Sequence, residues 1–425
     1  MTKLRWPLVL LTFVYILNFV DRQLVGILGQ PMKVELGLSD RQLGLLSGVA
    51  FALFYTTLGL PVARVAERKN RVSVIAISFA LWSAMTALCG VARTVPQIAL
   101  ARLGVGIGEA GFAPTAQSLI ADLLPPERRA TALSLFSLGI PAGMLIGAVA
   151  GGWLAQSLGW RMAFLCLGVP GVGLAALLAL VMREPRTAAA PVEHPSLTQV
   201  ALSLWHAPGF VHMAAGASIS SFAGYGLTSF AVPLLMRSYG LPLGEAATGF
   251  GMVAGVSIGI GIGSGGWLAD RQRRDGGAGR IAAAGALIAA LLFPLTLSFS
   301  DPRLLALAAV MPLAGAHLYF GPTYGVTVNS VGPKARATAI AILLMAMNAV
   351  GLGLGPLVVG MLSDGFAAAA LPSYVPTCHS AACQAASAQG LVKALRVDML
   401  LYFWAALHFL FAGRAMRRIQ VSKIA

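Results

Sequence analysis

The segments AERKNR (Ala66–Arg71) and ADRQRR (Ala269–Arg274) share one pattern, and this pattern determines the fold. Each follows a long apolar stretch and places an acid directly before an arginine, with a second arginine one turn later. A second motif, RATA, recurs in the same order at Arg129–Ala132 and Arg336–Ala339. Because the spacing between the two copies of each motif is nearly constant, we expect the second half of the chain to repeat the first.

Around these segments the chain is apolar, with 57% hydrophobic and only 11% charged residues. A soluble domain carries roughly a quarter charged residues. The apolar residues form blocks of about twenty, enough to cross a hydrocarbon core as helices. We therefore expect an all-α membrane protein with twelve transmembrane helices in two pseudo-symmetric six-helix halves. The blocks lie near Trp6–Gly29, Gln42–Ala66, Val72–Ala92, Gln97–Ala121, Ala130–Ser157, Met162–Met182, Pro208–Met236, Gly244–Ala269, Ile281–Ser300, Leu304–Ser330, Ala337–Leu362 and Arg396–Gly413.

The blocks divide into an N-terminal bundle (1–182), a cytoplasmic linker (183–207) and a C-terminal bundle (208–425). The first block follows two basic residues, as in a signal peptide, but it is too long for one and lacks a cleavage site, so we expect it to be retained. In the linker, apolar residues between Leu197 and Trp205 share one helical face. Both a helix on the membrane surface and an unstructured linker fit this pattern.

The net charge of +15 would suggest nucleic acid in a soluble protein, but no nucleic-acid motif is present. Most Lys and Arg residues instead fall in alternate loops, which is the pattern of cytoplasmic loops. We expect a multi-pass protein of the cell inner membrane, with both termini in the cytoplasm.

Four charged residues lie deep in the first and fourth blocks: Asp21, Arg22, Arg102 and Glu109. Such residues are costly in a membrane and are usually functional. Arg102 and Glu109 lie about two helical turns apart and share a face. If the two spans are neighbours, Asp21 can pair with Arg102. The acids would then exchange protons and Arg22 would bind an anionic substrate group; the alternative is a fixed structural ion-pair network.

The second half contains no matching set of charges. Between Pro208 and Gly413 we expect His317, His212 and His408 to be the titratable groups well inside a span, apart from Cys and Tyr. His317 fits a ligand of a proton or substrate, and equally a packing histidine. The candidates for lining a cavity are Tyr225, His317, Tyr319 and Tyr324.

The two charged turns fit a cytoplasmic gate. An acid and a base at a helix end can pair across the halves and bond free helix ends, although plain loop charge is an alternative. The residues of this gate are Glu67, Arg68, Arg71, Asp270, Arg271 and Arg274.

Cys378 and Cys383 lie in a long loop that should face outward, so we expect a disulfide. A metal site is an alternative, but with His379 the loop offers fewer than four ligands. We expect no metal and no cofactor.

Glycine series such as Gly104-x-Gly106-x-Gly108 and Gly261-x-Gly263-x-Gly265 faintly resemble nucleotide-binding loops. They lack the strand that such loops require. We expect them to allow close packing of helices.

Gly266–Arg274 resembles the Gly-x-x-Ala-Asp-Arg-x-x-Arg signature of the major facilitator superfamily, and the first copy departs from it at Ala63 and Glu67. Asn18–Arg22 and Gly106–Ala110 resemble the spinster-like subfamily, which is associated with proton-linked export of lysolipids and sphingolipids. The resemblance implies that Asp21 and Glu109 bind protons, with Arg22 and Arg102 as charge partners. Anion:cation symporters share similar motifs, which keeps small organic anions open as substrates.

These observations predict a proton-coupled secondary transporter that works by alternating access on an amphipathic, lipid-like molecule. The alternative is a proton-coupled symporter of small organic anions. An enzyme is disfavoured because Ser, His and acidic residues do not cluster in the sequence, and a receptor would not need duplicated turns. We expect the partners to be the proton, the substrate and the lipid bilayer, with no nucleic acid and a monomeric chain.

Overall fold

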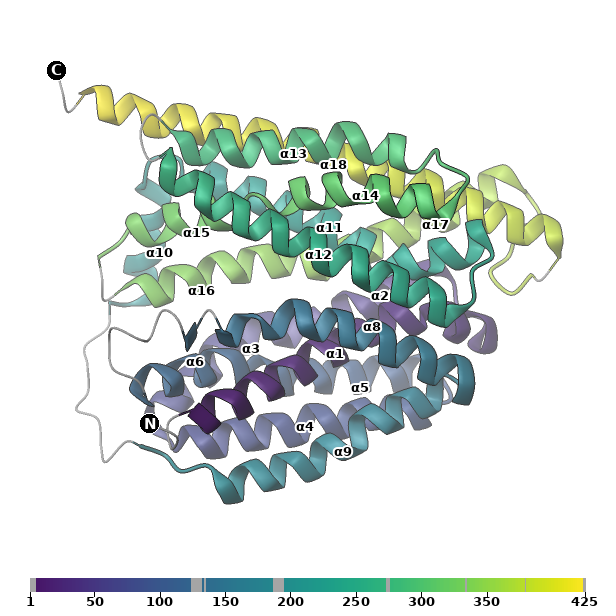
Figure 1. Cartoon of the computed structure of the whole chain (residues 1–425), viewed down its shortest axis with the longest axis horizontal. Helices are drawn as coiled ribbons and strands as arrows, with labels where there is room; N and C mark the ends of the chain where they lie inside the picture. The colour runs from purple at the N-terminus through teal and green to yellow at the C-terminus, as the bar shows by residue number, and fades with distance from the viewer. Residues whose placement is uncertain are drawn as a thin grey trace. The chain divides into compact units, whose positions relative to one another are not determined.

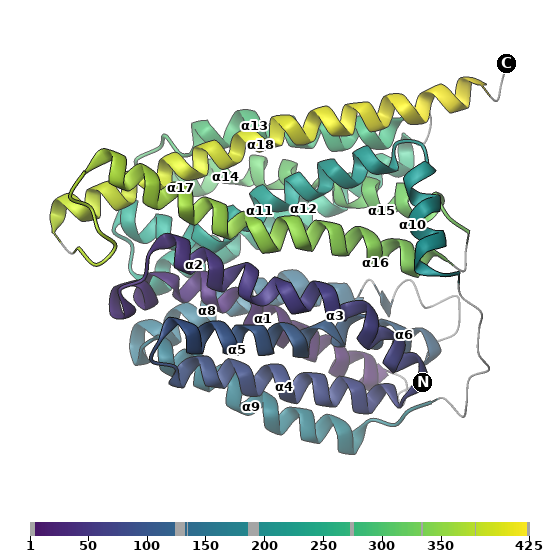
Figure 2. The ribbon, with the colours of Figure 1, turned by 180° about the vertical axis from the view of Figure 1, so that it is seen from behind.

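The computed structural model describes residues 5–123, 132–133, 135–185, 195–272, 276–332, 335–378 and 380–422. Within these ranges the regular structure is helical (Figures 1 and 2). The helices are α1 (Arg5–Leu36), α2 (Asp40–Ser47), α3 (Val49–Arg68), α4 (Arg71–Val91), α5 (Val95–Ala110), α6 (Phe112–Leu123), α8 (Gly139–Leu158), α9 (Trp160–Val181), α10 (Leu197–His206), α11 (Phe210–Tyr239), α12 (Leu243–Arg271), α13 (Gly277–Thr296), α14 (Pro302–His317), α15 (Phe320–Asn329), α16 (Arg336–Met347), the π-helical segment η3 (Asn348–Leu354), α17 (Gly355–Ala370) and α18 (Ala381–Ser422).

The described residues contain 11 helical stretches that are long and apolar enough to cross a membrane. The remaining expected span is the fourth, which is broken at Gly111 into α5 and α6. Each piece is shorter than a span, but together they cover the fourth apolar block of the sequence. The expected architecture of twelve transmembrane helices is thus confirmed.

The chain divides into two compact units. The first contains the described residues of Met1–Ala190, Ser229–Met252 and Ser373–Gln384, and the second contains the rest. The first unit therefore includes the last part of α11 and the first part of α12, and α11 passes from one unit to the other directly after Thr228. The expected boundaries near residues 182 and 208 stay a prediction.

Glycines bring the helices of the first unit close together, as the sequence predicts. In α8, a Cβ atom on Gly143 would lie 2.5 Å from the carbonyl oxygen of Ile16 in α1. In α5, a Cβ on Gly106 would lie 2.3 Å from the carbonyl oxygen of Phe51 in α3. Only glycine permits such approaches, so these glycines serve helix packing rather than phosphate binding.

The linker contains a helix, α10, whose first turn is closed by reciprocal hydrogen bonds between Ser196 and Gln199. Val200 and Leu204 of α10 are buried against Ala339 of α16, within the second unit. The helical interpretation of this segment is thus confirmed, whereas Trp205 stays 68% exposed.

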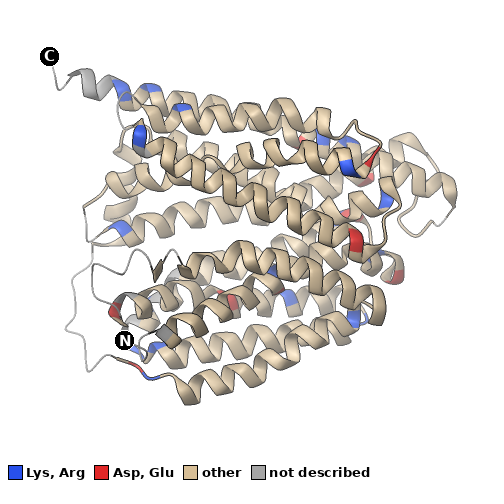
Figure 3. Ribbon diagram, viewed as in Figure 1, with Lys and Arg blue, Asp and Glu red and all other residues tan. Residues whose placement is uncertain are grey.

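Charged residues gather near the ends of the helices, and few lie along their middles (Figure 3). The last helix departs from the prediction, because α18 begins at Ala381 rather than near Arg396. Asp398 consequently lies well inside this helix and is only 2% exposed. The expectation that histidines alone, besides Cys and Tyr, titrate within the second-half spans was therefore wrong. The error arose because the polar start of α18 conceals its length.

Candidate functional site

Asp21 of α1 lies at the centre of a buried polar cluster in the first unit. Its Oδ1 accepts a hydrogen bond from the hydroxyl of Thr86 in α4 at 2.6 Å. Its Oδ2 lies 3.9 Å from Nη1 of Arg102 in α5, which is an ion-pair distance but too long for a hydrogen bond. The structure thus brings Asp21 and Arg102 together. Thr86 was missed in the sequence because a single threonine in an apolar span is common.

Arg22 forms an ion pair with Glu109 of α5. The Nη2 and Nε atoms of Arg22 donate to Oε2 of Glu109 at 2.7 and 3.2 Å. The guanidinium group of Arg22 also lies 4.5 Å from the ring centroid of Tyr55 and 4.8 Å from that of Phe19. Arg22 is therefore held by a carboxylate and by aromatic rings.

Arg102 is almost fully buried, yet its Nε and Nη1 atoms have no hydrogen-bond partner among the described residues. Its guanidinium lies 5.0 Å from the ring centroid of Phe51, a ring that Arg22 approaches at 5.2 Å. Asp21 Oδ2 and Glu109 Oε1 likewise lack hydrogen-bond partners there. The two acids are close enough to interact electrostatically. The cluster thus holds two acids and two arginines, and some of their donor and acceptor atoms are unused. These atoms allow the acids and arginines to exchange hydrogen-bond partners.

A cavity of about 20 Å³ adjoins Asp21. It is lined by apolar residues and by the hydroxyl-bearing Ser83 and Thr86 of α4. A space of this size holds about one water molecule. A water here would contact Asp21 and one or two hydroxyl groups, which offers the acid a partner for proton exchange.

Several aromatic side chains lie near one another in the second unit. Tyr319 is buried, and its hydroxyl lies 3.2 Å from the hydroxyl of Ser221 in α11. Tyr225 and Tyr324 are near enough to interact with Tyr319 electrostatically. His317 bonds through Nδ1 to the carbonyl of Leu313 in its own helix at 2.8 Å. The tyrosines therefore form one group, while the contacts of His317 are those of a packing histidine.

The cytoplasmic gate residues are described only in part. Arg71 is fully buried and pairs with Asp122 at 2.7 Å and with Glu184 at 2.6 Å, all within the first unit. Arg271 is exposed and lies over the ring of Trp267 at 4.1 Å. The remaining predicted side chains, those of Glu67, Arg68, Asp270 and Arg274, lie outside the described part.

A buried triad that the sequence did not reveal joins the end of α1 to α11. Asp40, at the start of α2, accepts from Nζ of Lys33 at 2.8 Å. It also accepts two hydrogen bonds from Arg237 of α11, at 2.6 and 2.7 Å. Arg237 further donates to Gln30 at 2.6 Å. Arg237 lies 197 residues from Asp40 in the sequence, and the three residues resemble ordinary loop charges, so only their packing reveals the triad.

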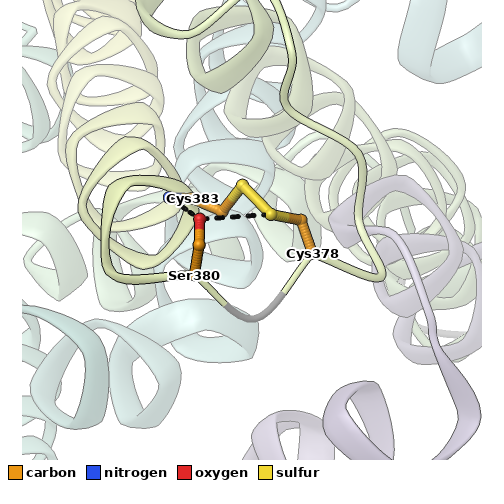
Figure 4. Close-up of a disulfide and its surroundings, with 3 residues drawn as sticks. All are labelled: Cys378, Ser380 and Cys383. Atoms are coloured by element: carbon orange, nitrogen blue, oxygen red, sulfur yellow. Dashed lines mark hydrogen bonds between the residues drawn. A yellow bond between two sulfur atoms is a disulfide. The ribbon is translucent and has the colours of Figure 1, made fainter.

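A disulfide joins Cys378, in the segment between α17 and α18, to Cys383 in the first turn of α18 (Figure 4). The hydroxyl of Ser380 lies 3.4 Å from the sulfur of Cys378 and accepts from the backbone N–H of Cys383 at 3.3 Å. This small loop closes the first turn of α18. His379 lies outside the described residues.

Comparisons with known proteins agree with this architecture. The sequence profile of the Major Facilitator Superfamily matches residues 11–356. The chain is 38% identical over 357 residues to a protein named MFS-type efflux pump from Mycolicibacterium smegmatis, covering 83% of each chain. It is 26% identical over 393 residues to Protein spinster homolog 1 of Xenopus tropicalis, covering 86% of this chain and 74% of the relative.

Among solved structures, the chain is similar to a bacterial homolog of the human lysosomal transporter Spinster, crystallised in an inward-facing and unoccupied conformation. The TM-score is 0.89 at 30% identity, and the match covers 98% of both chains. These similarities confirm the spinster-like resemblance of the motifs Asn18–Arg22 and Gly106–Ala110.

Proposed function

Because this chain belongs to the major facilitator superfamily, we propose that it is a proton-coupled secondary transporter that works by alternating access and moves an amphipathic, lipid-like molecule. The family match and the spinster relatives identify the chain as a membrane transporter and not an enzyme. We further propose a monomer in the inner membrane with both termini in the cytoplasm, as the distribution of Lys and Arg favours.

The observation that carries the proposal is the buried cluster of Asp21, Arg22, Arg102 and Glu109. Uptake of a proton by Glu109 neutralises this acid and leaves Arg22 without its counter-charge. An anionic group of the substrate could then pair with Arg22 and restore the balance. The carboxylate of Glu109 and the substrate would thereby compete for the same arginine.

The aromatic residues of the second unit support an amphipathic substrate. Tyr225 and Tyr324 are half-buried and Tyr319 is buried, and the rings of such a group suit contact with an apolar tail. The resemblance to spinster-like proteins implies lysolipids and sphingolipid-type molecules. The name of one relative, an MFS-type efflux pump, favours movement out of the cytoplasm.

A second candidate is symport of a small organic anion. It is favoured by the two buried arginines, because a guanidinium binds a carboxylate in a bidentate manner. In this case the tyrosines would serve packing alone.

The test uses purified protein in proteoliposomes with a pH-sensitive dye inside. We expect a lysophospholipid to drive proton movement in the wild type, and the Asp21→Asn and Glu109→Gln variants to lose most of it. Asp364→Asn, an acid of α17 outside the cluster, is the matched control and should behave as wild type. A sugar-acid anion replaces the lysolipid in the second arm. Proton movement with the anion alone would favour the second candidate, and lysolipid transport without protons would overturn coupling.

A further inference from the structure

Asp398 of α18 is a buried acid without a partner. Its exposure is 2%, and neither carboxyl oxygen has a hydrogen-bond partner among the described residues. No ion pair involves it in that part of the chain. The other buried acids differ, because Asp21 bonds to Thr86, Asp40 to Lys33 and Arg237, and Glu109 to Arg22. Asp398 therefore needs a ligand that the protein's own side chains do not supply.

Asp398 lies close to the backbone of α11. A Cβ atom placed on Gly226 of α11 would lie 2.8 Å from Oδ2 of Asp398 and 2.7 Å from Cγ2 of Val359 in α17. The carboxyl group thus meets the bare backbone of α11, and a side chain at position 226 would collide with it. All three residues belong to the second unit.

Within the described residues, no Lys, Arg or His forms a hydrogen bond or ion pair with this acid. Gly226 of α11 approaches Asp398, and Val359 of α17 lies beside the same glycine; neither residue titrates. On α18, Tyr402 follows one turn later and is buried, with its hydroxyl 3.5 Å from the carbonyl of Ser220. Arg396 is exposed and donates to the carbonyl of Leu297 at 3.3 Å. The further charged residues of these helices within the second unit are Asp364, which is half-buried, Lys393, which is exposed, and the basic residues near the end of α18.

An isolated ionised carboxylate in such surroundings is far more costly than a neutral carboxyl group, so the group takes up a proton instead. A proton is also the one ligand that needs no additional space between Asp398 and Gly226. Even a neutral carboxyl without hydrogen bonds is unfavourable in the interior. Membrane proteins keep such groups mainly where they act.

Asp398 lies against a part of α11 where a bend of this helix would change its packing. This helix passes from the second compact unit to the first directly after Thr228, close to Gly226. The hydroxyl of Thr228 donates to the carbonyl of Gly224 at 2.7 Å, a bond that tends to bend membrane helices. A change in α11 at this point would move Gly226 relative to Asp398 and admit water to the carboxyl group.

We propose that Asp398 is a second proton-binding site, which holds its proton while α11 packs on it and releases it to water when α11 moves away. The O–H bond of the carboxyl group breaks, the proton passes to water, and the carboxylate is hydrated in its place. This inference rests on the proposed proton-coupled transport and adds a proton site in the C-terminal part, separate from Asp21 and Glu109.

The test is infrared spectroscopy of the whole protein in lipid nanodiscs, which detects the C=O stretching band of a protonated carboxylic acid. We expect Asp398→Asn to lose one such band and the matched control Asp364→Asn to keep it. In the wild type, this band should weaken in alkaline buffer. A band that persists in Asp398→Asn, or that keeps its intensity in both acidic and alkaline buffer, overturns the proposal.

A second variant that keeps the acid tests whether misfolding of Asp398→Asn explains the loss of the band. Gly226→Ala keeps the acid but crowds it, so the band should shift in frequency rather than vanish. This spectroscopic result does not depend on the substrate. If the wild type moved no protons with lysolipid or anion while Asp398→Asn still lost a titrating band, the proposed function would fail and the proton site would stand.

Discussion

The ion pair of Arg22 and Glu109 can be tested as either a proton-coupling site or a fixed structural pair. Glu109 is 1% exposed, and the side chain of Arg22 is 8% exposed. Removing one partner of such a pair leaves an uncompensated charge, whereas removing both does not. The strength of this linkage decides how tightly proton uptake by Glu109 would be tied to release of Arg22.

We expect Glu109→Gln to destabilise the protein by about 3–5 kcal/mol, because Arg22 keeps its charge but loses its carboxylate. The double variant Arg22→Gln, Glu109→Gln should lose clearly less than the sum of the two single variants. Thermal unfolding in detergent measures all three. Losses that simply add would show that the pair is not coupled, and would contradict the proposed competition between Glu109 and the substrate for Arg22.

The sequence allowed the cluster to be predicted but not its bonds. Asp21, Arg22, Arg102 and Glu109 stand out because charges are rare in apolar blocks, and helical spacing placed Arg102 and Glu109 on one face. The pairing of Arg22 with Glu109 and of Asp21 with Thr86 depends on side-chain directions and on α4. Such tertiary information is not carried by spacing within a single helix.

At the scale of elements, glycine determines how closely α8 approaches α1. A Cβ on Gly143 would lie 2.5 Å from both the Ile16 carbonyl oxygen and the Phe19 Cβ. Gly173 of α9 provides a matched control, because a Cβ there would meet nothing within 4 Å.

We expect Gly143→Ala to lower stability by about 1–3 kcal/mol through overpacking, since the backbone of α1 cannot yield easily. Gly173→Ala should be neutral or slightly stabilising, because alanine favours the helix. Thermal unfolding of both variants in the same detergent is the measurement. Equal melting temperatures for the two variants would mean that α1 and α8 can separate without cost.

The triad of Lys33, Asp40 and Arg237 holds the last part of α11 to α1 and α2. Arg237→Gln would remove both hydrogen bonds from Arg237 to Asp40 and the bond to Gln30. We expect this variant to loosen the end of α11. Spin labels at Val34 and Ser238, in a protein lacking Cys89 and Cys166, should report a longer or broader distance than without the substitution.

The control for this measurement is Arg303→Gln, an exposed arginine of the second unit. It should leave the distance between the labels unchanged. If Arg237→Gln also left it unchanged, the triad would not control the position of α11.

For the whole molecule, the number of spans could be predicted because the membrane imposes its requirement locally, as a run of about twenty apolar residues. The prediction was less accurate where burial depends on neighbouring helices. The start of α18, from Ala381 to Arg396, is too polar to be recognised as part of a span, although its helix continues without a break. The burial of Asp398 was missed for this reason.

Sidedness can be tested on the whole molecule through its disulfide. The disulfide lies at the start of α18, and the C-terminus follows about 40 residues later, after the described end of this helix at Ser422. In right-side-out vesicles, we expect a membrane-impermeant reductant to make both cysteines available to an impermeant thiol reagent, while a tag on the C-terminus stays protected from protease. Labelling only after the membrane is permeabilised would reverse the proposed orientation.

The enclosure of the triad at Asp40 limits how strongly dissolved salt can act on it. Dissolved ions weaken attraction between charges that face water, but they act far less on charges enclosed by protein. The side chains of Asp40 and Arg237 are only 1% and 5% exposed. The join between α11 and the first two helices should therefore hold equally well in fresh water and in brine, and osmotic changes alone should not unlock it.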